Sequence, residues 1–195
     1  MKNSFLTITY QFLLKNHTVK EEDKERILYG LEGLYLTFTK LIILFLLSIF
    51  FSMTKELFLL LILFQGLRFT GFGFHASTSF QCLVLSISFF ILFPLIFFSF
   101  SFSKIIYFIL SLVSLFCFLL YAPADTFKRP LTNKRKRIRR KIITILIGGL
   151  YMIFLIYSYP NRISTLFLLA LIIEAINIHP ILYKIFHQSY RNYQK

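Results

Sequence analysis

The stretch Leu83–Phe98 reads LVLSISFFILFPLIFF and contains no charged side chain. Three other runs are similarly apolar: Leu41–Phe51, Ile105–Leu120 and Ile142–Tyr157. Each approaches the roughly 20 apolar residues that a helix needs to cross a bilayer. A soluble domain of 195 residues, 57% of them hydrophobic and 26 of them Phe, would have to leave much of that apolar surface in water. The sequence therefore predicts an integral membrane protein.

The apolar runs predict an all-α, polytopic fold with about six membrane helices. The second predicted span is weak, because only eight apolar residues precede Gln65 and Arg68. A short helix that dips into the membrane would fit, and so would a full span with Arg68 buried and paired. The six spans are expected near Leu34–Phe51, Glu56–Leu67, Leu83–Phe100, Ile105–Tyr121, Ile142–Tyr159 and Ile163–His179.

The chain is predicted to form one domain, residues 1–195, with a cytoplasmic or interfacial N-terminal region, a membrane region and a tail. Their predicted ranges are 1–33, 34–182 and 183–195. On a helix, Phe5, Ile8 and Phe12 would share one face. That pattern suits a helix in the membrane interface, and a surface helix packed on the bundle fits equally well. The N-terminus lacks the cleavage site of a signal peptide.

Basic residues predict how the chain is oriented. The net charge is +14, and the stretch Lys128–Lys141 (KRPLTNKRKRIRRK) holds nine basic residues and no acidic one. Because loops rich in Lys and Arg stay in the cytoplasm, we expect a multi-pass protein of the cell membrane with both termini inside. The loops Arg68–Cys82 and Ala122–Lys141 then share the cytoplasmic face. The basic stretch lacks interleaved aromatic residues, so we expect no nucleic-acid partner.

His75 and Cys82 supply an imidazole and a thiol, the two groups that nucleophilic catalysis by cysteine requires. On one unbroken helix, seven residues would separate them by roughly 10 Å. We therefore expect a break at Gly71 and Gly73, with His75 on a loop and Cys82 in the first turns of the third span. Ordinary polar residues at a span boundary are the alternative. The chain's four His and two Cys make a metal site a weaker hypothesis.

The stretch RFTGFGFHASTSFQC, residues 68–82, resembles the motif of the accessory gene regulator B (AgrB) family of membrane peptidases: an arginine, a glycine pair, a His-Ala and a later cysteine. The matching residues are Arg68, Gly73, His75, Ala76 and Cys82. Phe72 departs from the motif, since it stands where the first glycine of the pair is usual. A second stretch, YAPADTFKRPLTNKRKR, also resembles the family, through Ala122, Pro123, Asp125, Lys128, Pro130 and Leu131.

The resemblance implies a cysteine endopeptidase that matures a quorum-sensing propeptide of the AgrD kind, without a cofactor. Cys82 would attack a backbone carbonyl in the C-terminal part of the propeptide, and His75 would act as general base and then as general acid. A Cys or Ser of the bound peptide would capture the acyl-thioester, which closes a thiolactone or lactone ring. The alternative is a non-enzymatic transporter or partner-binding scaffold, in which Arg68, His75 and Glu174 line a polar path.

The remaining candidate residues support or surround this site. The basic stretch, including Lys128, Lys134 and Arg135, is expected to bind an acidic substrate tail or anionic lipid. Arg68 would bind a substrate carboxylate or pair with Glu56 or Asp125. Glu174 lies within the last span, and its conceivable partners are Arg68 and Lys40. Asp125 would orient His75, and Gln81 would cap the helix or donate to an oxyanion. A homodimer is compatible with the weak second span. His179 is expected to be a helix cap.

Overall fold

The computed structural model describes residues 21–74, 76, 78–125 and 131–190. These residues are almost entirely helical, apart from their loops and one isolated bridge between Phe72 and Ala124. Four helical segments are long and apolar enough to span a membrane: Gly33–Phe50, Ser79–Ser99, Lys104–Tyr121 and Lys134–Ser158. The all-helical fold is thus confirmed over the described residues, and these segments indicate a membrane protein.

The chain divides into two compact units, residues 1–47 and 48–195. The first unit contains most of α2 (Glu21–Phe50), whose apolar part, Gly33–Phe50, has a mean hydropathy of 2.0. Large apolar side chains such as Phe38, Ile42 and Leu46 are exposed along this helix, as expected of a surface that faces lipid. The predicted amphipathic helix near the N-terminus falls on residues 1–20, which lie outside the described residues.

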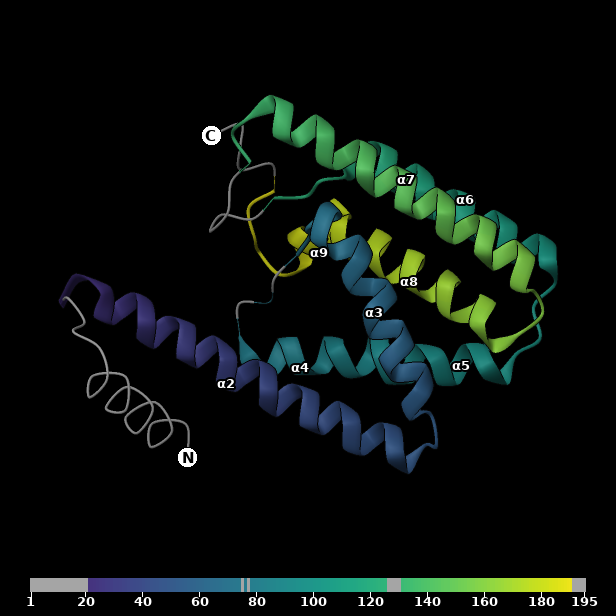
Figure 1. Ribbon diagram of the computed structural model, residues 1–195, viewed down its shortest axis with the longest axis horizontal. Coiled ribbons are helices and arrows are strands. Elements are labelled where there is room, and N and C mark those ends of the chain that lie inside the picture. Colours follow the sequence, from purple (N-terminus) through teal and green to yellow (C-terminus); the bar gives the residue numbers. More distant parts are fainter. Residues whose placement is uncertain (1–20, 75, 77, 126–130, 191–195) are drawn as a thin grey trace. The chain divides into compact units, whose positions relative to one another are not determined.

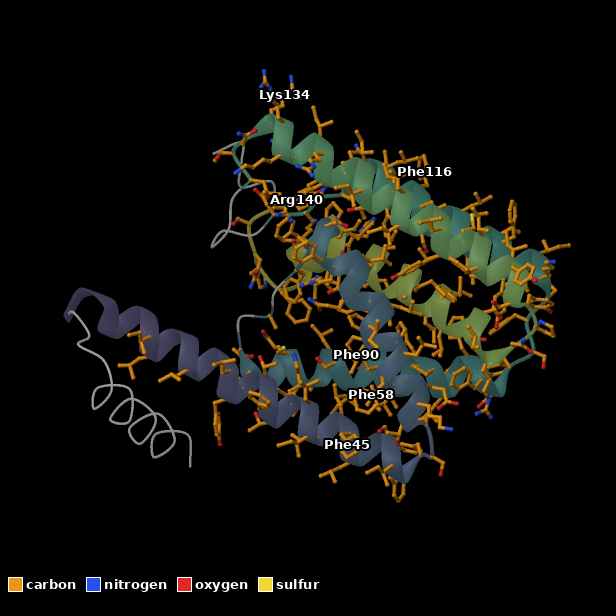
Figure 2. All side chains as sticks on the ribbon, in the orientation of Figure 1. Phe45, Phe58, Phe90, Phe116, Lys134 and Arg140 are labelled. Carbon is orange, nitrogen blue, oxygen red and sulfur yellow. The ribbon has the colours of Figure 1, made fainter. Side chains whose placement is uncertain are left out.

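The second unit is built around α8, and Figure 1 shows α6 and α7 running alongside it. Most side chains of α8 are buried, whereas α7 exposes large apolar residues such as Phe154 and α6 exposes others such as Phe116, which is labelled in Figure 2. The central helix is therefore covered by others that face the lipid. The helices of this unit are α3 (Thr54–Gly71), α4 (Ser79–Ile87), α5 (Phe93–Ser99), α6 (Lys104–Tyr121), α7 (Lys134–Ser158), α8 (Arg162–Ile178) and α9 (Pro180–Ile185).

The third predicted span is one continuous helical segment in three parts. A π-helical turn, η1 (Ser88–Leu92), joins α4 to α5. Pro94 follows this turn, and it has no backbone N–H with which to continue an α-helical hydrogen-bond pattern. The apolar composition of the run predicts its helical length, whereas its periodicity alone does not reveal the π turn.

The structure contains a helix at each of the six predicted spans, but two of them do not have the properties of ordinary lipid-exposed spans. Helix α3 carries Lys55, Glu56 and Arg68, and α8 has only 17 residues. The count of six therefore stays a prediction, as do the orientation of the chain and the homodimer.

The predicted loop Ala122–Lys141 is partly helical, which corrects the boundary drawn from hydropathy. Helix α7 already begins at Lys134, because the side-chain oxygen of Asn133 accepts a hydrogen bond from the Lys136 N–H at 3.2 Å and caps the helix. Lys and Arg have good helix propensity, so a basic segment continues an apolar helix without a break. Hydropathy cannot mark such a boundary, since it responds to charge and not to backbone conformation.

Candidate functional site

The chain breaks between α3 and α4 at a segment that we call the glycine arm, Gly71–Phe74. Helix α3 ends at Gly71, and the next two residues have positive φ angles of 61° at Phe72 and 106° at Gly73. The predicted break at the glycines is therefore confirmed. Positive φ is costly for Phe72, and the Arg140 guanidinium, which lies 4.4 Å from the centre of its ring, covers that side chain.

Backbone hydrogen bonds attach the glycine arm to two distant segments. The Gly73 N–H donates to the Ala124 carbonyl at 2.8 Å, and the Ala124 N–H donates to the Gly71 carbonyl at 2.9 Å. The Phe74 N–H donates to the Asn177 carbonyl, also at 2.9 Å. Asn177 is in the last turn of α8, where helical carbonyls lack partners within the helix. The motif loop, the 122–125 segment and the end of α8 therefore meet at one place.

Phe74 is held on several sides. Its side chain is buried, and its ring contacts the rings of Tyr183 and Phe186 at centroid distances of 5.9 and 4.8 Å. The Arg68 guanidinium donates a hydrogen bond to the Phe74 carbonyl. His75 and Ser77, which follow, lie outside the described residues, so the distance from His75 to Cys82 stays untested.

Two buried charged side chains lie against the glycine arm. A Cβ at Gly71 would meet Glu174 Oε1 at 2.5 Å, and a Cβ at Gly73 would meet Arg68 Nη1 at 2.5 Å. Position 73 therefore requires glycine, because it also has a φ of 106° and the backbone oxygen of Asn177 would lie 2.9 Å from its Cβ, whereas an alanine at position 71 would require the Glu174 carboxylate to move. The suggested pairing of Arg68 with Glu56 is wrong, because Glu56 accepts a hydrogen bond from Arg162 at 3.2 Å and α3 separates it from Arg68 by three turns. Arg68 instead lies, like Glu174, against the glycine arm.

Asp125 is buried in the 122–125 segment, and its Oδ2 accepts a hydrogen bond from the Leu131 N–H at 3.2 Å. The Tyr183 hydroxyl lies 3.4 Å from the carbonyl oxygens of both Ala124 and Asp125. Burial raises the pKa of the Tyr183 phenol, so this group stays neutral and can donate. Asp125 thus lies next to the glycine arm, while its predicted action on His75 stays a prediction.

Cys82 lies at the start of α4, as predicted from the sequence. Thr78 caps this helix: its Oγ1 accepts a hydrogen bond from the Gln81 N–H at 3.3 Å, and its carbonyl accepts one from the Cys82 N–H at 3.1 Å. The Cys82 side chain is half-buried, and neither described cysteine is in a disulfide. A thiolate near a helix N-terminus is favoured by the helix dipole.

Basic residues of α7 line a cavity of about 270 Å³ beside the 122–125 segment. Arg137 and Lys141, four residues apart on one face of α7, line it together with Asp125. The predicted Lys134 and Arg135 are instead exposed in the first turn of α7, and Lys128 lies outside the described residues. The sequence predicted a binding role for the whole stretch Lys128–Lys141 but did not single out Arg137 and Lys141, because that choice requires knowing where the helix starts and what packs against it.

A second, apolar groove of about 390 Å³ runs between α6, α8 and α9. Cys117 lines it, as suits a cysteine that behaves as a small apolar residue. His179 also lines it, and its Nδ1 accepts a hydrogen bond from the Ile181 N–H at 3.2 Å, so the predicted helix-capping role is confirmed. Among the described residues, no group of three or more His, Cys, Asp or Glu is arranged to hold a metal ion.

These features define a polytopic membrane protein with a motif cysteine at the start of a membrane helix and a buried, glycine-containing connection before it. The family model of accessory gene regulator B matches residues 7–178. The chain belongs to the AgrB family, as the resemblance predicted, and membership indicates a role in the quorum-sensing peptide processing of accessory gene regulator systems.

Named relatives agree with the family match. A putative AgrB-like protein of Clostridium acetobutylicum is 35% identical over 167 residues, which cover 84% of this chain and 78% of that protein. The accessory gene regulator protein B of Staphylococcus aureus strain Newman is 32% identical over 175 residues, covering 88% and 90%. A putative AgrB-like protein of Listeria innocua is 29% identical over 181 residues, covering 90% and 86%. No solved structure matches the chain.

Proposed function

We propose that this protein is a membrane-embedded cysteine endopeptidase that cleaves an AgrD-like propeptide, with Cys82 as nucleophile and His75 as general base. The main support is the break at the glycine arm, which ends α3 and lets a new helix begin with Cys82 in its first turns. An unbroken helix would keep positions 75 and 82 roughly 10 Å apart, so the break removes the main geometric obstacle.

The reaction has two acyl transfers. His75 removes the thiol proton, and Cys82 Sγ attacks a backbone carbonyl carbon of the propeptide, which forms a tetrahedral intermediate. The C–N bond then breaks, the leaving amine takes the proton from His75, and the propeptide's N-terminal part stays attached as a thioester. A Cys or Ser side chain of the same peptide next attacks the thioester carbonyl and releases Cys82 as a thiol. A thiolactone or lactone ring forms without ATP, because thioester exchange conserves the activated bond.

Ring closure requires that water be kept away from the thioester. Apolar residues follow Cys82, from Leu83 to Leu85, and α4 is the first part of the segment Ser79–Ser99, which has a mean hydropathy of 2.5. The start of this helix is therefore a suitable place for an acyl-enzyme that must react with a bound peptide in preference to water. We place the active site at the cytoplasmic face, because the neighbouring α7 begins with the basic run Lys134–Lys141.

The basic residues supply a binding region for an acidic substrate tail. Arg137 and Lys141 line the cavity beside Asp125, and Lys128, Lys134 and Arg135 add positive charge along the same stretch. Long-range attraction would raise the local concentration of an anionic peptide. Anionic lipid headgroups would be attracted in the same way, and both can act on one stretch.

Co-expression with the candidate propeptide encoded by a neighbouring reading frame tests the proposal, with the fragments identified by mass spectrometry. Wild-type protein and Cys117→Ser should yield the cyclic product, whereas Cys82→Ser and His75→Ala should each abolish cleavage. The transporter or scaffold alternative predicts the opposite, namely that Cys82→Ser leaves function intact. Processing that survives Cys82→Ser would therefore refute the peptidase.

A further inference from the structure

Helices α3 and α8 carry two pairs of opposite charges, one toward each end of their contact. Arg162 and Glu56 form an ion pair of 3.2 Å where both helices begin, and the Arg162 side chain is largely exposed. Arg68 and Glu174 lie toward the other end, beside the glycine arm, and Glu174 is fully buried. An exposed ion pair contributes little to stability, whereas a buried acid in a membrane protein is usually functional or paired. The buried pair therefore requires an explanation that the exposed one does not.

The buried pair has polar atoms that no described residue satisfies. Arg68 uses one end of its guanidinium to bind the Phe74 carbonyl, while its Nη1 has no hydrogen-bond partner among the described residues. Both carboxylate oxygens of Glu174 are also buried without a hydrogen bond from the described part of the chain. Leaving such groups unpaired is costly. Each side chain carries the charge opposite to the other's, and both lie against the glycine arm.

The glycine arm passes directly between these charges. Glu174 Oε1 lies 2.5 Å from the position of a Cβ on Gly71, and Arg68 Nη1 lies 2.5 Å from the position of a Cβ on Gly73. Beyond Gly73, the arm reaches Phe74, whose carbonyl accepts from Arg68 and whose N–H donates to the Asn177 carbonyl on α8. A change in the Arg68–Glu174 interaction would therefore move the peptide unit immediately before His75.

We propose that Glu174 is a positioning residue for the reaction: together with Arg68, its carboxylate holds the glycine arm, from which the chain continues directly to the motif histidine. This inference rests on the proposed function, since it matters only if His75 and Cys82 act together. Glu174 itself does not touch the substrate or the reacting atoms. Its role is to neutralise and orient the guanidinium that binds the carbonyl of Phe74.

The test measures how fast iodoacetamide alkylates Cys82 in full-length protein in liposomes, in a Cys117→Ser background. The rates near about pH 6.5 and about pH 9 are compared, because an imidazole that holds a thiolate raises the low-pH rate selectively. We expect Glu174→Gln to lower the ratio of the rate at about pH 6.5 to the rate at about pH 9 by about tenfold, and we expect the same of His75→Ala. Glu56→Gln, which removes the exposed ion pair between the same two helices, should change the ratio less than about twofold.

Glu174→Asp keeps the carboxylate but shortens the side chain, so it separates charge from shape. It also provides a second test if the glutamine variant does not fold. A positioning carboxylate predicts that Asp retains more of the wild-type ratio than Gln, although Gln matches the shape of Glu better. Equal ratios for Glu174→Gln and Glu56→Gln would overturn the inference, and so would a ratio closer to the wild-type value for Glu174→Gln than for Glu174→Asp. Either result would leave the proposed peptidase function intact. A His75→Ala variant with the wild-type ratio would instead refute the proposed catalytic pair and the inference with it.

Discussion

The side-chain oxygens of Thr70 and Thr144 lie 2.9 Å apart and form a buried hydrogen bond. It joins the last turn of α3 to the turn of α7 that follows the basic run Lys134–Lys141. Arg140, one turn earlier on α7, donates to the Phe69 carbonyl at 3.0 Å (Figure 2). The basic beginning of α7 is thereby attached to the helix that leads into the glycine arm. Residues that look like a charged loop in the sequence thus help to hold the candidate site.

Replacing Thr144 by Val removes this hydrogen bond while keeping the shape of the side chain. We expect a loss of stability of about 1 kcal/mol, because the Thr70 hydroxyl loses a buried partner. The midpoint of unfolding in mixed micelles measures the effect. Ser99→Ala is the matched control, since the Ser99 hydroxyl is exposed and bonds within its own helix to Leu95. Equal midpoints for both variants would show that the contact contributes nothing.

Gly73→Ala should abolish precursor processing. A Cβ there would lie 2.5 Å from Arg68 Nη1 and 2.9 Å from the Asn177 carbonyl oxygen, at a φ of 106° that L-residues rarely adopt. Strain of this kind costs about 1–3 kcal/mol, so the arm must shift. Gly149→Ala is the control, because nothing lies within 4 Å of its added Cβ. Product yield, measured by mass spectrometry at equal protein levels, compares the two. Normal processing by Gly73→Ala would contradict the described geometry.

The two cysteines should differ in reactivity toward a water-soluble maleimide at neutral pH. Cys82 is at the start of α4, and Cys117, four residues before the end of α6, lines an apolar groove. Because the thiolate is the reactive form and apolar surroundings disfavour it, Cys82 should react at least about tenfold faster. Single-cysteine variants followed by gel shift give the two rates. Faster labelling of Cys117 would argue against an activated Cys82.

Removing the charges that line the cavity should weaken substrate binding. Arg137→Ala with Lys141→Ala is expected to raise KM for an acidic-tailed peptide about tenfold and to leave kcat nearly unchanged, since the loss falls on binding. The control is Lys134→Ala with Arg135→Ala, which removes the same charge from exposed positions at the start of α7. If both double variants raise KM equally, overall charge matters and the cavity does not.

Much of the fold is predictable from local composition. Apolar runs separated by charged turns predict the helices, and α2, α4 to α5, α6 and α7 confirm four of them as long enough to span. The glycines at 71 and 73 predict the break after α3, and Cys82 lies in the first turns of the next helix as expected. These features depend on residues that are close together in the chain, so they can be predicted from a single sequence.

The contacts of the site could not be predicted in the same way. The sequence suggests several partners for Arg68, and it also places two basic residues, Lys134 and Arg135, in the site. The structure puts Glu174 near Arg68, and it places Arg137 and Lys141 at the cavity. Arg68 and Glu174 are 106 positions apart, and Lys141 is 16 positions from Asp125. No local periodicity reports such relations.

The amino-acid sequence by itself determined that the chain is helical and membrane-embedded, which residues carry the family motif, and where the chain must bend. Those properties follow from hydropathy and from the conformational freedom of single residues. Tertiary structure decided which charges meet at the glycine arm, because α8 is buried at the centre of its unit and brings Glu174 and Asn177 against residues 71–74. Packing of distant helices, and not the order of residues along the chain, selects those neighbours.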